Sequence, residues 1–122
     1  ADRPSATIYG ARYRIHQPLT MIKVIFHEAD QKIYVKVKGH SLSAPKGADL
    51  VCAGVSSVTT GALNALDHPT SFQIISNEGL LEIMTITTVS AHDQVVLQTM
   101  LRQLETIAEA YPQYVKISKK GT

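Results

Sequence analysis

The residues best suited to chemistry are His40, which follows Gly39, and Cys52, the only cysteine of the chain. A single cysteine cannot form an intrachain disulfide, so it serves either packing or chemistry. At the start of a helix, a thiol lies near the positive end of the helix dipole, which favours the thiolate. A histidine close to it in the fold would accept the proton and later return it, which predicts nucleophilic catalysis. The alternative is a small buried side chain and an incidental histidine.

The segment before this pair has the pattern of two strands. Residues 21–26 are mostly apolar, and in residues 33–38 isoleucine and valine alternate with tyrosine and lysine. This period of two is typical of a sheet with one buried face and one exposed face. Between the strands, residues 28–31 suit a hairpin turn, although they lack the glycine that such turns favour. His40 is therefore predicted at the end of the second strand.

A loop of small residues then leads to a predicted helix over residues 48–66. Its apolar positions recur three and four residues apart: Val51, Val55, Val58, Ala62 and Leu66. Asp49 is suited to the N-cap, which places Cys52 at the third helical position. Asp49, Cys52 and Ser56 then form one stripe of the helix that can face His40.

The rest of the chain repeats the pattern of strands followed by a helix. Strands are predicted at residues 71–76 and 80–88, and a last strand at 114–119. The helix between them has capping-box spacing at Ser90 and Asp93. Its apolar stripe is Val96, Met100, Leu104, Ile107 and Tyr111. The order ββαββαβ predicts a two-layer α+β fold, with two helices on one face of a largely antiparallel five-stranded sheet.

Length and composition describe one domain. The chain has 122 residues, of which 44% are hydrophobic and 18% charged. Its apolar runs are shorter than the roughly 18 to 20 residues of a membrane span. The amino terminus lacks the apolar region of a secretory signal, and one thiol without a disulfide framework suits a reducing compartment. We therefore predict a cytoplasmic protein that does not span a membrane.

The net charge of +2 is confined to the first twenty residues. Residues 1–20 hold three arginines and one aspartate, whereas the remainder has nine basic and nine acidic residues. We predict that residues 1–20 are a leader added for expression and that residues 21–122, from Met21 onward, form the domain. The alternative is a genuine basic arm. The neutral domain argues against nucleic acid as the main partner, because phosphate binding depends on clustered cations.

Two short motifs resemble a known family. Gly39-His40, then Asp49 and the run Val51-Cys52-Ala53-Gly54-Val55-Ser56, are similar to the paired motifs of the ribosomal-processing cysteine proteases. Those motifs are Gly-His-Ala and Val-Cys-Ala-x-Val-Ser/Thr, with an aspartate shortly before the cysteine. The resemblance extends from Met21 to about the last strand. It departs at Ser41, where the family usually has alanine.

The resemblance implies a function. Family members are cytoplasmic endopeptidases that remove the amino-terminal extension of a bacterial large-subunit ribosomal protein, number twenty-seven, so that extension peptide is the expected partner. They are homodimers, with two helices against one side of a five-stranded sheet. By position, His40 and Cys52 take the catalytic roles, and Gly39, Asp49 and Ser56 match supporting positions.

The mechanism that this implies is acyl transfer. The Cys52 thiolate attacks the scissile carbonyl, and His40 protonates the leaving amine and then activates the water that releases the acyl group. Backbone N–H groups at the helix start, those of Cys52 and Ala53, are expected to form an oxyanion hole. Asp49 either orients His40 or the loop or only caps the helix. Ser56 either takes part in such a hydrogen bond or is an ordinary helix hydroxyl.

Other classes of function have weaker support. A zinc site of Cys52, His40 and His68 lacks the ligand spacing of such sites, and no phosphate-binding or dinucleotide motif is present, so we predict neither metal nor cofactor. His27, His68 and His92 are predicted to be surface or helix-end histidines. A non-catalytic ribosome-assembly or RNA-binding α+β module remains the main alternative, although the chain lacks an aromatic stacking platform. A catalytically idle scaffold or dimerisation domain is the second alternative.

Overall fold

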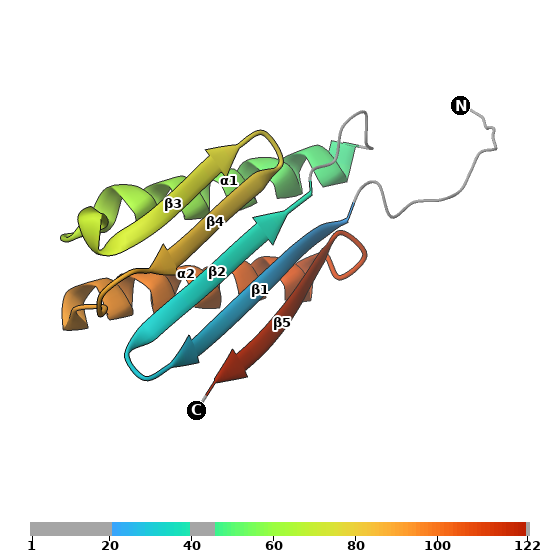
Figure 1. Cartoon of the computed structure of the whole chain (residues 1–122). Coiled ribbons are helices and arrows are strands. Elements are labelled where there is room, and N and C mark those ends of the chain that lie inside the picture. Colours follow the sequence, from blue (N-terminus) through green and yellow to red (C-terminus); the bar gives the residue numbers. More distant parts are fainter. Residues whose placement is uncertain (1–20, 40–45, 122) are drawn as a thin grey trace.

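The computed structural model describes residues 21–39 and 46–121, in which the strands and helices follow the predicted order (Figure 1). The elements are β1 (Ile22–Ala29), β2 (Lys32–Lys38), α1 (Lys46–Ala65), the short 3-10 helix η2 (Pro69–Ser71), β3 (Phe72–Asn77), β4 (Leu80–Thr85), α2 (Ala91–Ala110) and β5 (Val115–Gly121). His40 and the predicted leader lie outside the described residues. No helix among those described is long and apolar enough to cross a membrane.

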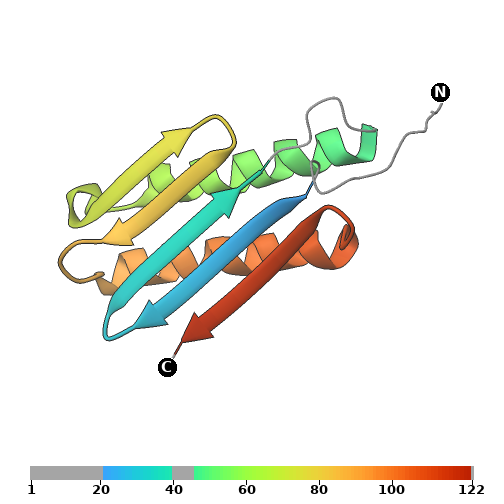
Figure 2. The same cartoon turned by 45° about the vertical axis from the view of Figure 1, so that its right-hand side comes forward.

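The five strands form one sheet in the order β3-β4-β2-β1-β5. Neighbouring strands are antiparallel except β1 and β5, which are parallel because α2 carries the chain back across the sheet before β5 begins. Both helices cover the same face of the sheet, and its other face carries no described helix (Figures 1 and 2). The predicted two-layer α+β fold is confirmed.

The core lies between the sheet and the two helices. Alternate residues of β1 and β2 point into it, among them Val24 and its register partner Val37, both buried. The buried residues of α2 are Asp93, Leu97, Met100, Leu101 and Leu104. The predicted stripe of this helix was therefore right at Met100 and Leu104 but wrong at Tyr111, which is an exposed C-cap residue.

The β1–β2 hairpin turns without glycine. Asp30 and Gln31 both have positive φ, 53° and 62°, which matches the right-handed twist of the flanking strands. Aspartate tolerates this left-handed region better than most residues because its short polar side chain bonds locally. The carbonyl of Gln31 accepts a hydrogen bond of 3.0 Å from Val89 N–H, which ties the turn to the segment before α2.

Several predicted boundaries were wrong by a few residues, and one of them affects the site. Helix α1 begins at Lys46, two residues before the predicted start. Asp49 is therefore inside the helix and is not its N-cap, and Cys52 lies in the second turn rather than the first. A proline directly precedes Lys46 in the sequence, and proline is favoured at helix starts. Strand β4 ends at Thr85, short of the predicted Thr88.

Candidate active site

Cys52 lines a cavity of about 140 Å³ at one end of the sheet. Its walls come from β1, the end of β2, α1 and the β3–β4 hairpin: Ile22, Val37, Gly39, Cys52, Val55, Ser56, Leu63, Ser76, Asn77, Gly79, Leu80 and Leu81. The buried neighbours Val51 and Val55 hold this part of α1 against the core, and Cys52 is half-buried beside them. The thiol therefore borders a hollow instead of being sealed in the core.

Two glycines shape the rim of this cavity. Gly39 has φ of 111° and Gly79 has φ of 76°, both in the left-handed region that favours glycine. The N–H of Gly39 donates a 2.9 Å hydrogen bond to the carbonyl of Gly79. A Cβ at position 39 would lie 2.3 Å from the carbonyl oxygen of Met21, so the backbone there has room only for glycine.

The structure brings three of the predicted site residues together. Gly39, Cys52 and Ser56 line the same cavity, and Ser56 is exposed one helical turn after the cysteine. His40 and the side chain of Asp49 lie outside the described part of the chain, so their predicted roles stay predictions. His40 is the residue that follows Gly39 in the sequence.

The predicted oxyanion hole does not fit the start of α1. Only the first four N–H groups of a helix lack intrahelical acceptors, because each later one donates to the carbonyl four residues before it. With α1 starting at Lys46, the N–H groups of Cys52 and Ala53 belong to the bonded interior. We expected these two N–H groups to be free to bind an oxyanion because the predicted helix began at residue 48, two residues later than α1 does.

Other hollows in the described structure contain no cysteine. One of about 460 Å³ lies between α1 and α2, one of about 280 Å³ lies beside β5, and one of about 320 Å³ lies on β1, β2 and β4. All three are larger than the Cys52 cavity. The Cys52 cavity is the candidate site because it alone among these hollows is bordered by a thiol, a side chain suited to nucleophilic chemistry.

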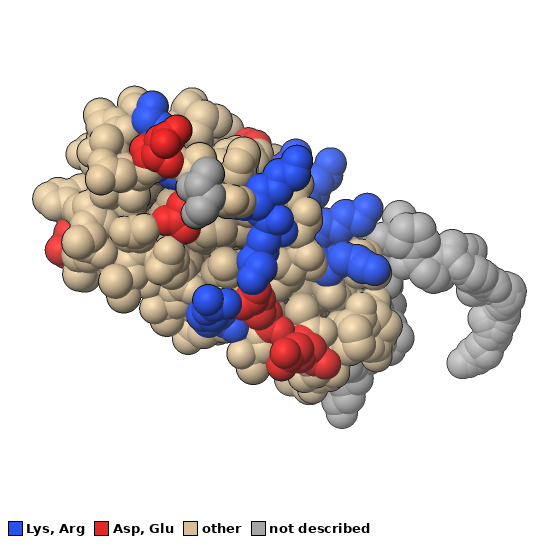
Figure 3. Space-filling model, turned by 90° about the horizontal axis from the view of Figure 1, so that it is seen from below, with Lys and Arg blue, Asp and Glu red and all other residues tan. Residues whose placement is uncertain are grey.

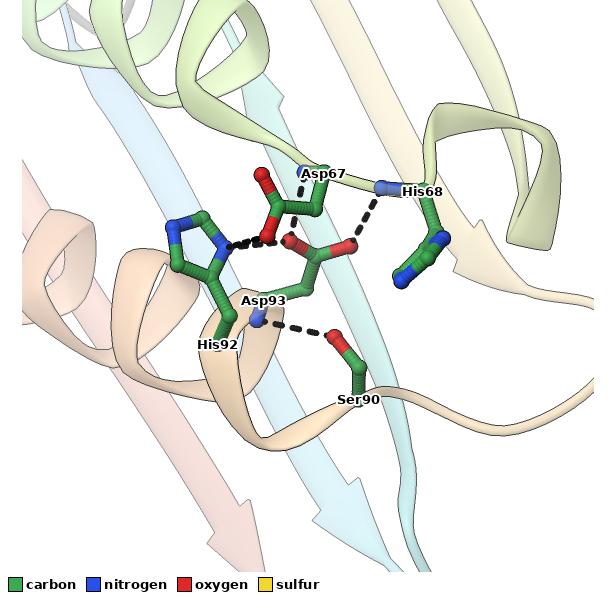
Figure 4. Close-up of polar contacts among 5 residues, drawn as sticks. All are labelled: Asp67, His68, Ser90, His92 and Asp93. Carbon is green, nitrogen blue, oxygen red and sulfur yellow. Dashed lines mark hydrogen bonds and ion pairs between the residues drawn. The ribbon is translucent and has the colours of Figure 1, made fainter.

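A second polar cluster lies at the far end of α1 (Figure 4). Asp93 in the first turn of α2 is fully buried, and its two carboxylate oxygens accept hydrogen bonds from the N–H groups of Asp67 at 2.7 Å and His68 at 3.0 Å. Ser90 Oγ accepts from the Asp93 N–H at 3.1 Å, which confirms the predicted cap. The sequence did not reveal that the Asp93 carboxylate would bond to a segment 25 residues away.

His92 completes this cluster. Its Nδ1 lies 2.9 Å from Asp93 Oδ1 and 3.3 Å from Asp67 Oδ2. The hydrogen bond to Asp93 raises the pKa of His92, with smaller contributions from the charges of both carboxylates. Burial opposes ionisation of Asp93, but the hydrogen bonds from Asp67, His92 and His68 outweigh it and hold its pKa below the ordinary value.

The cluster is built to hold the fold rather than a metal ion. One ligand atom each from Asp67, His92 and Asp93 lies within 4.8 Å of the others. Both oxygens of Asp93, however, already accept backbone hydrogen bonds that fix the connection after α1. His92 is thus a helix-end histidine, as predicted. The zinc alternative is wrong, because His68 follows the far end of α1, about 20 Å along the helix from Cys52.

Comparison with known proteins agrees with the geometry. The family model described as cysteine protease Prp matches residues 21–116. The ribosomal processing cysteine protease Prp of Staphylococcus aureus strain Mu50 is 36% identical over 90 residues, which cover 70% of this chain and 85% of the relative. Two crystal structures of the S. aureus protease also match, each covering 82% of this chain and 100% of theirs. The one with a substrate peptide has a TM-score of 0.71 at 34% identity, and the one with a covalently linked product peptide 0.69 at 35%.

A half-buried thiol beside an open cavity, on a fold shared with these structures, defines the class of cysteine proteases. Within that class, the chain belongs to the Prp family.

Proposed function

We propose that this chain is an endopeptidase that removes the amino-terminal extension of a bacterial large-subunit ribosomal protein, number twenty-seven, with Cys52 as nucleophile and His40 as acid and base. The observation that carries the proposal is the shared cavity of Cys52 and Gly39, because Gly39 directly precedes His40 in the chain. Family membership and the ribosomal-processing names of the relatives support the class of substrate.

The proposed reaction has two steps. The Cys52 sulfur attacks the scissile carbonyl, a C–S bond forms, and the C–N bond breaks as His40 gives its proton to the leaving amine. His40 then takes a proton from water, whose oxygen attacks the thioester. The C–S bond breaks, the acid is released, and the Cys52 sulfur leaves as the thiolate beside protonated His40. The covalently linked product peptide in an S. aureus relative supports a covalent route.

Three residues have proposed supporting roles. Gly39 keeps the rim open, because any side chain there would meet Met21 and would need a strained backbone. Ser56 offers a hydroxyl in the same cavity as the thiol. Asp49 is one turn before Cys52 on α1 and is proposed to orient His40 or the segment that leads to the helix.

The protease is favoured over a non-catalytic module for one reason. The match to a cysteine protease family covers residues 21–116, which include Cys52, the only cysteine of the chain. A binding module or scaffold would have no need of a thiol at a cavity. We further propose that the enzyme acts in the cytoplasm, where ribosomes are made, and as a homodimer, which light scattering on the purified chain would test.

Peptide cleavage tests the proposal directly. A peptide spanning the extension junction is incubated with the wild type, Cys52→Ala and His40→Ala, and the fragments are identified by mass spectrometry. We expect both variants to lose at least about a thousandfold in kcat/KM, because neither acyl transfer nor its proton transfers can proceed. Cleavage by Cys52→Ala at the wild-type rate would overturn the nucleophile assignment.

The chain offers a matched control for each variant. His27→Ala removes an exposed histidine of β1, and Ser57→Ala changes an exposed residue of α1 away from the thiol's cavity. Both should cleave the peptide at the wild-type rate. Failure of the folded wild type to cut the junction peptide, with Cys52 shown to be reduced, would overturn the proposed substrate.

A further inference from the structure

The exposed face of the sheet carries a straight row of three lysines. Lys23 of β1 is the register partner of Lys38 on β2 and of Lys116 on β5. These three strands are neighbours in the sheet, so the three side chains point to the same side about 4.8 Å apart, and the row spans roughly 10 Å. The next positions along the row, Leu80 and Asn77, are uncharged.

This arrangement is unfavourable for the isolated fold. Like charges placed directly opposite each other on neighbouring strands repel. All three lysines are exposed, and none of them has an ion pair or hydrogen bond with another side chain of residues 21–39 and 50–121. Lys119, in contrast, pairs with Glu105 at 2.8 Å. The row therefore has unsatisfied positive charge that an anionic partner would neutralise.

The lysine row, Lys23-Lys38-Lys116, lies at the same end of the sheet as the Cys52 cavity. Lys23 follows Ile22, Lys38 precedes Gly39, and both Ile22 and Gly39 line that cavity. The lysines occupy the exposed face, whereas the cavity is on the helix-covered side. Figure 3, which views the molecule from below relative to Figure 1, shows basic side chains close together on that surface, with acidic side chains next to some of them.

We propose that the lysine row is a docking surface for the phosphate backbone of single-stranded RNA. A row of three point charges matches a linear polyanion, and lysine binds phosphate without reading the base. The choice of RNA over an acidic peptide rests on the proposed function, because an enzyme that processes a ribosomal protein acts among ribosomal RNA. The neutral net charge of the domain conceals this surface, since strand register concentrates three of its nine basic residues in one line.

The test measures RNA binding separately from peptide cleavage. Fluorescence anisotropy follows a labelled RNA of about 20 nucleotides with the full chain between about 50 and 200 mM salt. The row variant is K23Q/K38Q/K116Q. Its control, K32Q/R102Q/K120Q, removes the same net charge from exposed positions outside the row. Circular dichroism establishes that each variant is folded, and removal of opposed like charges should leave the row variant melting no lower than the wild type.

For the wild type, we expect a plot of the logarithm of the association constant against the logarithm of the salt concentration to have a slope of about −2. This value corresponds to three phosphate contacts, each of which contributes about −0.7. The row variant should lose at least about tenfold in affinity at the lowest salt and approach a slope of zero. The control should stay within about twofold of the wild type. Single Lys→Gln variants, each lowering the slope by about 0.7, replace the triple variant if it does not fold.

Three results would overturn the proposal. They are a wild type that does not bind RNA, an equal loss in the row variant and the control, and equally tight binding of an oligoglutamate of matching charge. The last would assign the row to acidic peptides. Cleavage of the junction peptide is expected to be unchanged in the row variant. Failure of RNA binding therefore leaves the proposed protease untouched, and the two failures are distinguished by separate assays.

Discussion

The two ends of α1 are built in different ways. At one end, Cys52 borders a cavity whose rim is set by the backbone of Gly39 and Gly79. At the other end, the residues that follow the helix, Asp67 and His68, are held by the buried carboxylate of Asp93. The first end has space beside a thiol, whereas at the second both oxygens of the buried carboxylate accept backbone hydrogen bonds.

This difference shows how to separate a functional cluster from a structural one. A histidine and two aspartates gather at the far end, yet both carboxylate oxygens of the buried Asp93 already accept hydrogen bonds from backbone N–H groups. A buried polar group that is fully hydrogen-bonded stabilises a fold and has little capacity left for a ligand. Open volume beside a reactive atom is the better sign of chemistry.

Among substitutions at the two ends of α1, Gly39→Ala is expected to change the unfolding free energy most. The added Cβ would lie 2.3 Å from Met21 O at φ of 111°, so the backbone must shift, and we expect a loss of roughly 3 kcal/mol in unfolding free energy. Urea denaturation measures this loss. Because Gly39 lines the Cys52 cavity, cleavage of the junction peptide should fall as well under conditions in which the variant is folded.

Gly61→Ala is the matched control. Gly61 lies in α1 with nothing within 4 Å of the position of an added Cβ. Alanine is better than glycine inside a helix, so this variant should gain about 0.5 to 1 kcal/mol. A Gly39→Ala variant as stable as the wild type would contradict the claim that the backbone at position 39 has room only for glycine.

The next largest effect is expected at the other end, from Asp93→Ala. Removal of the carboxylate takes away hydrogen bonds to a charged group from the N–H groups of Asp67 and His68, which should cost about 2 kcal/mol. Urea denaturation again gives the value. Cleavage of the junction peptide by the folded variant should match the wild type, because this end is remote from Cys52.

Asp67→Asn provides the comparison within the same cluster. The Asp67 side chain is 58% exposed, and its carboxylate lies 3.3 Å from the His92 ring. Exposed ion pairs contribute roughly 0 to 1 kcal/mol, so the substitution should have a much smaller effect than Asp93→Ala. Equal losses of unfolding free energy in Asp67→Asn and Asp93→Ala would mean that the burial of Asp93 and its hydrogen bonds from backbone N–H groups do not explain its contribution to stability.

The sequence predicted the architecture well because local patterns determine it. Alternation in β1 and β2 and the stripe through Val51, Val55 and Ala62 identify which faces are buried. The Ser90 cap is equally local, since the cap and the N–H group that donates to it lie three residues apart. The proximity of Cys52 to Gly39 followed from family motifs and from the placement of a strand end beside a helix.

What the sequence did not reveal depends on contacts between distant segments. Asp93 accepts from residues 26 and 25 positions earlier, which no periodicity encodes. The lysine row depends on the register of β1 with both β2 and β5, so Lys23, Lys38 and Lys116 look unrelated in the sequence. The earlier start of α1 was missed because the run before Ala48 looks like a loop, and it changed the position of Cys52 in the helix.

The smallest effect is a pH dependence at the Asp93 end. His92 has a raised pKa in the folded state, so its contribution is complete below the unfolded value of about 6.5 and is lost as pH rises through the folded value. Asp93 has a lowered pKa, so its contribution is present above about 3.9 and is lost as pH falls through its folded value. The cluster should therefore stabilise the fold most between about pH 4 and 6.5.

The measurement is the melting temperature of the wild type and His92→Gln at a series of pH values from about 5 to 8.5. The wild type should melt higher than His92→Gln at the acidic end, and the difference should shrink as the imidazolium loses its proton and with it the attraction to Asp93 and Asp67. His27→Gln changes an exposed histidine of β1 that contacts no carboxylate in the described structure, so its difference from the wild type should not follow this course. A His92→Gln difference that is the same at every pH would show that the ring contributes through packing alone, and the Asp93 end would then owe its stability to the backbone hydrogen bonds without His92.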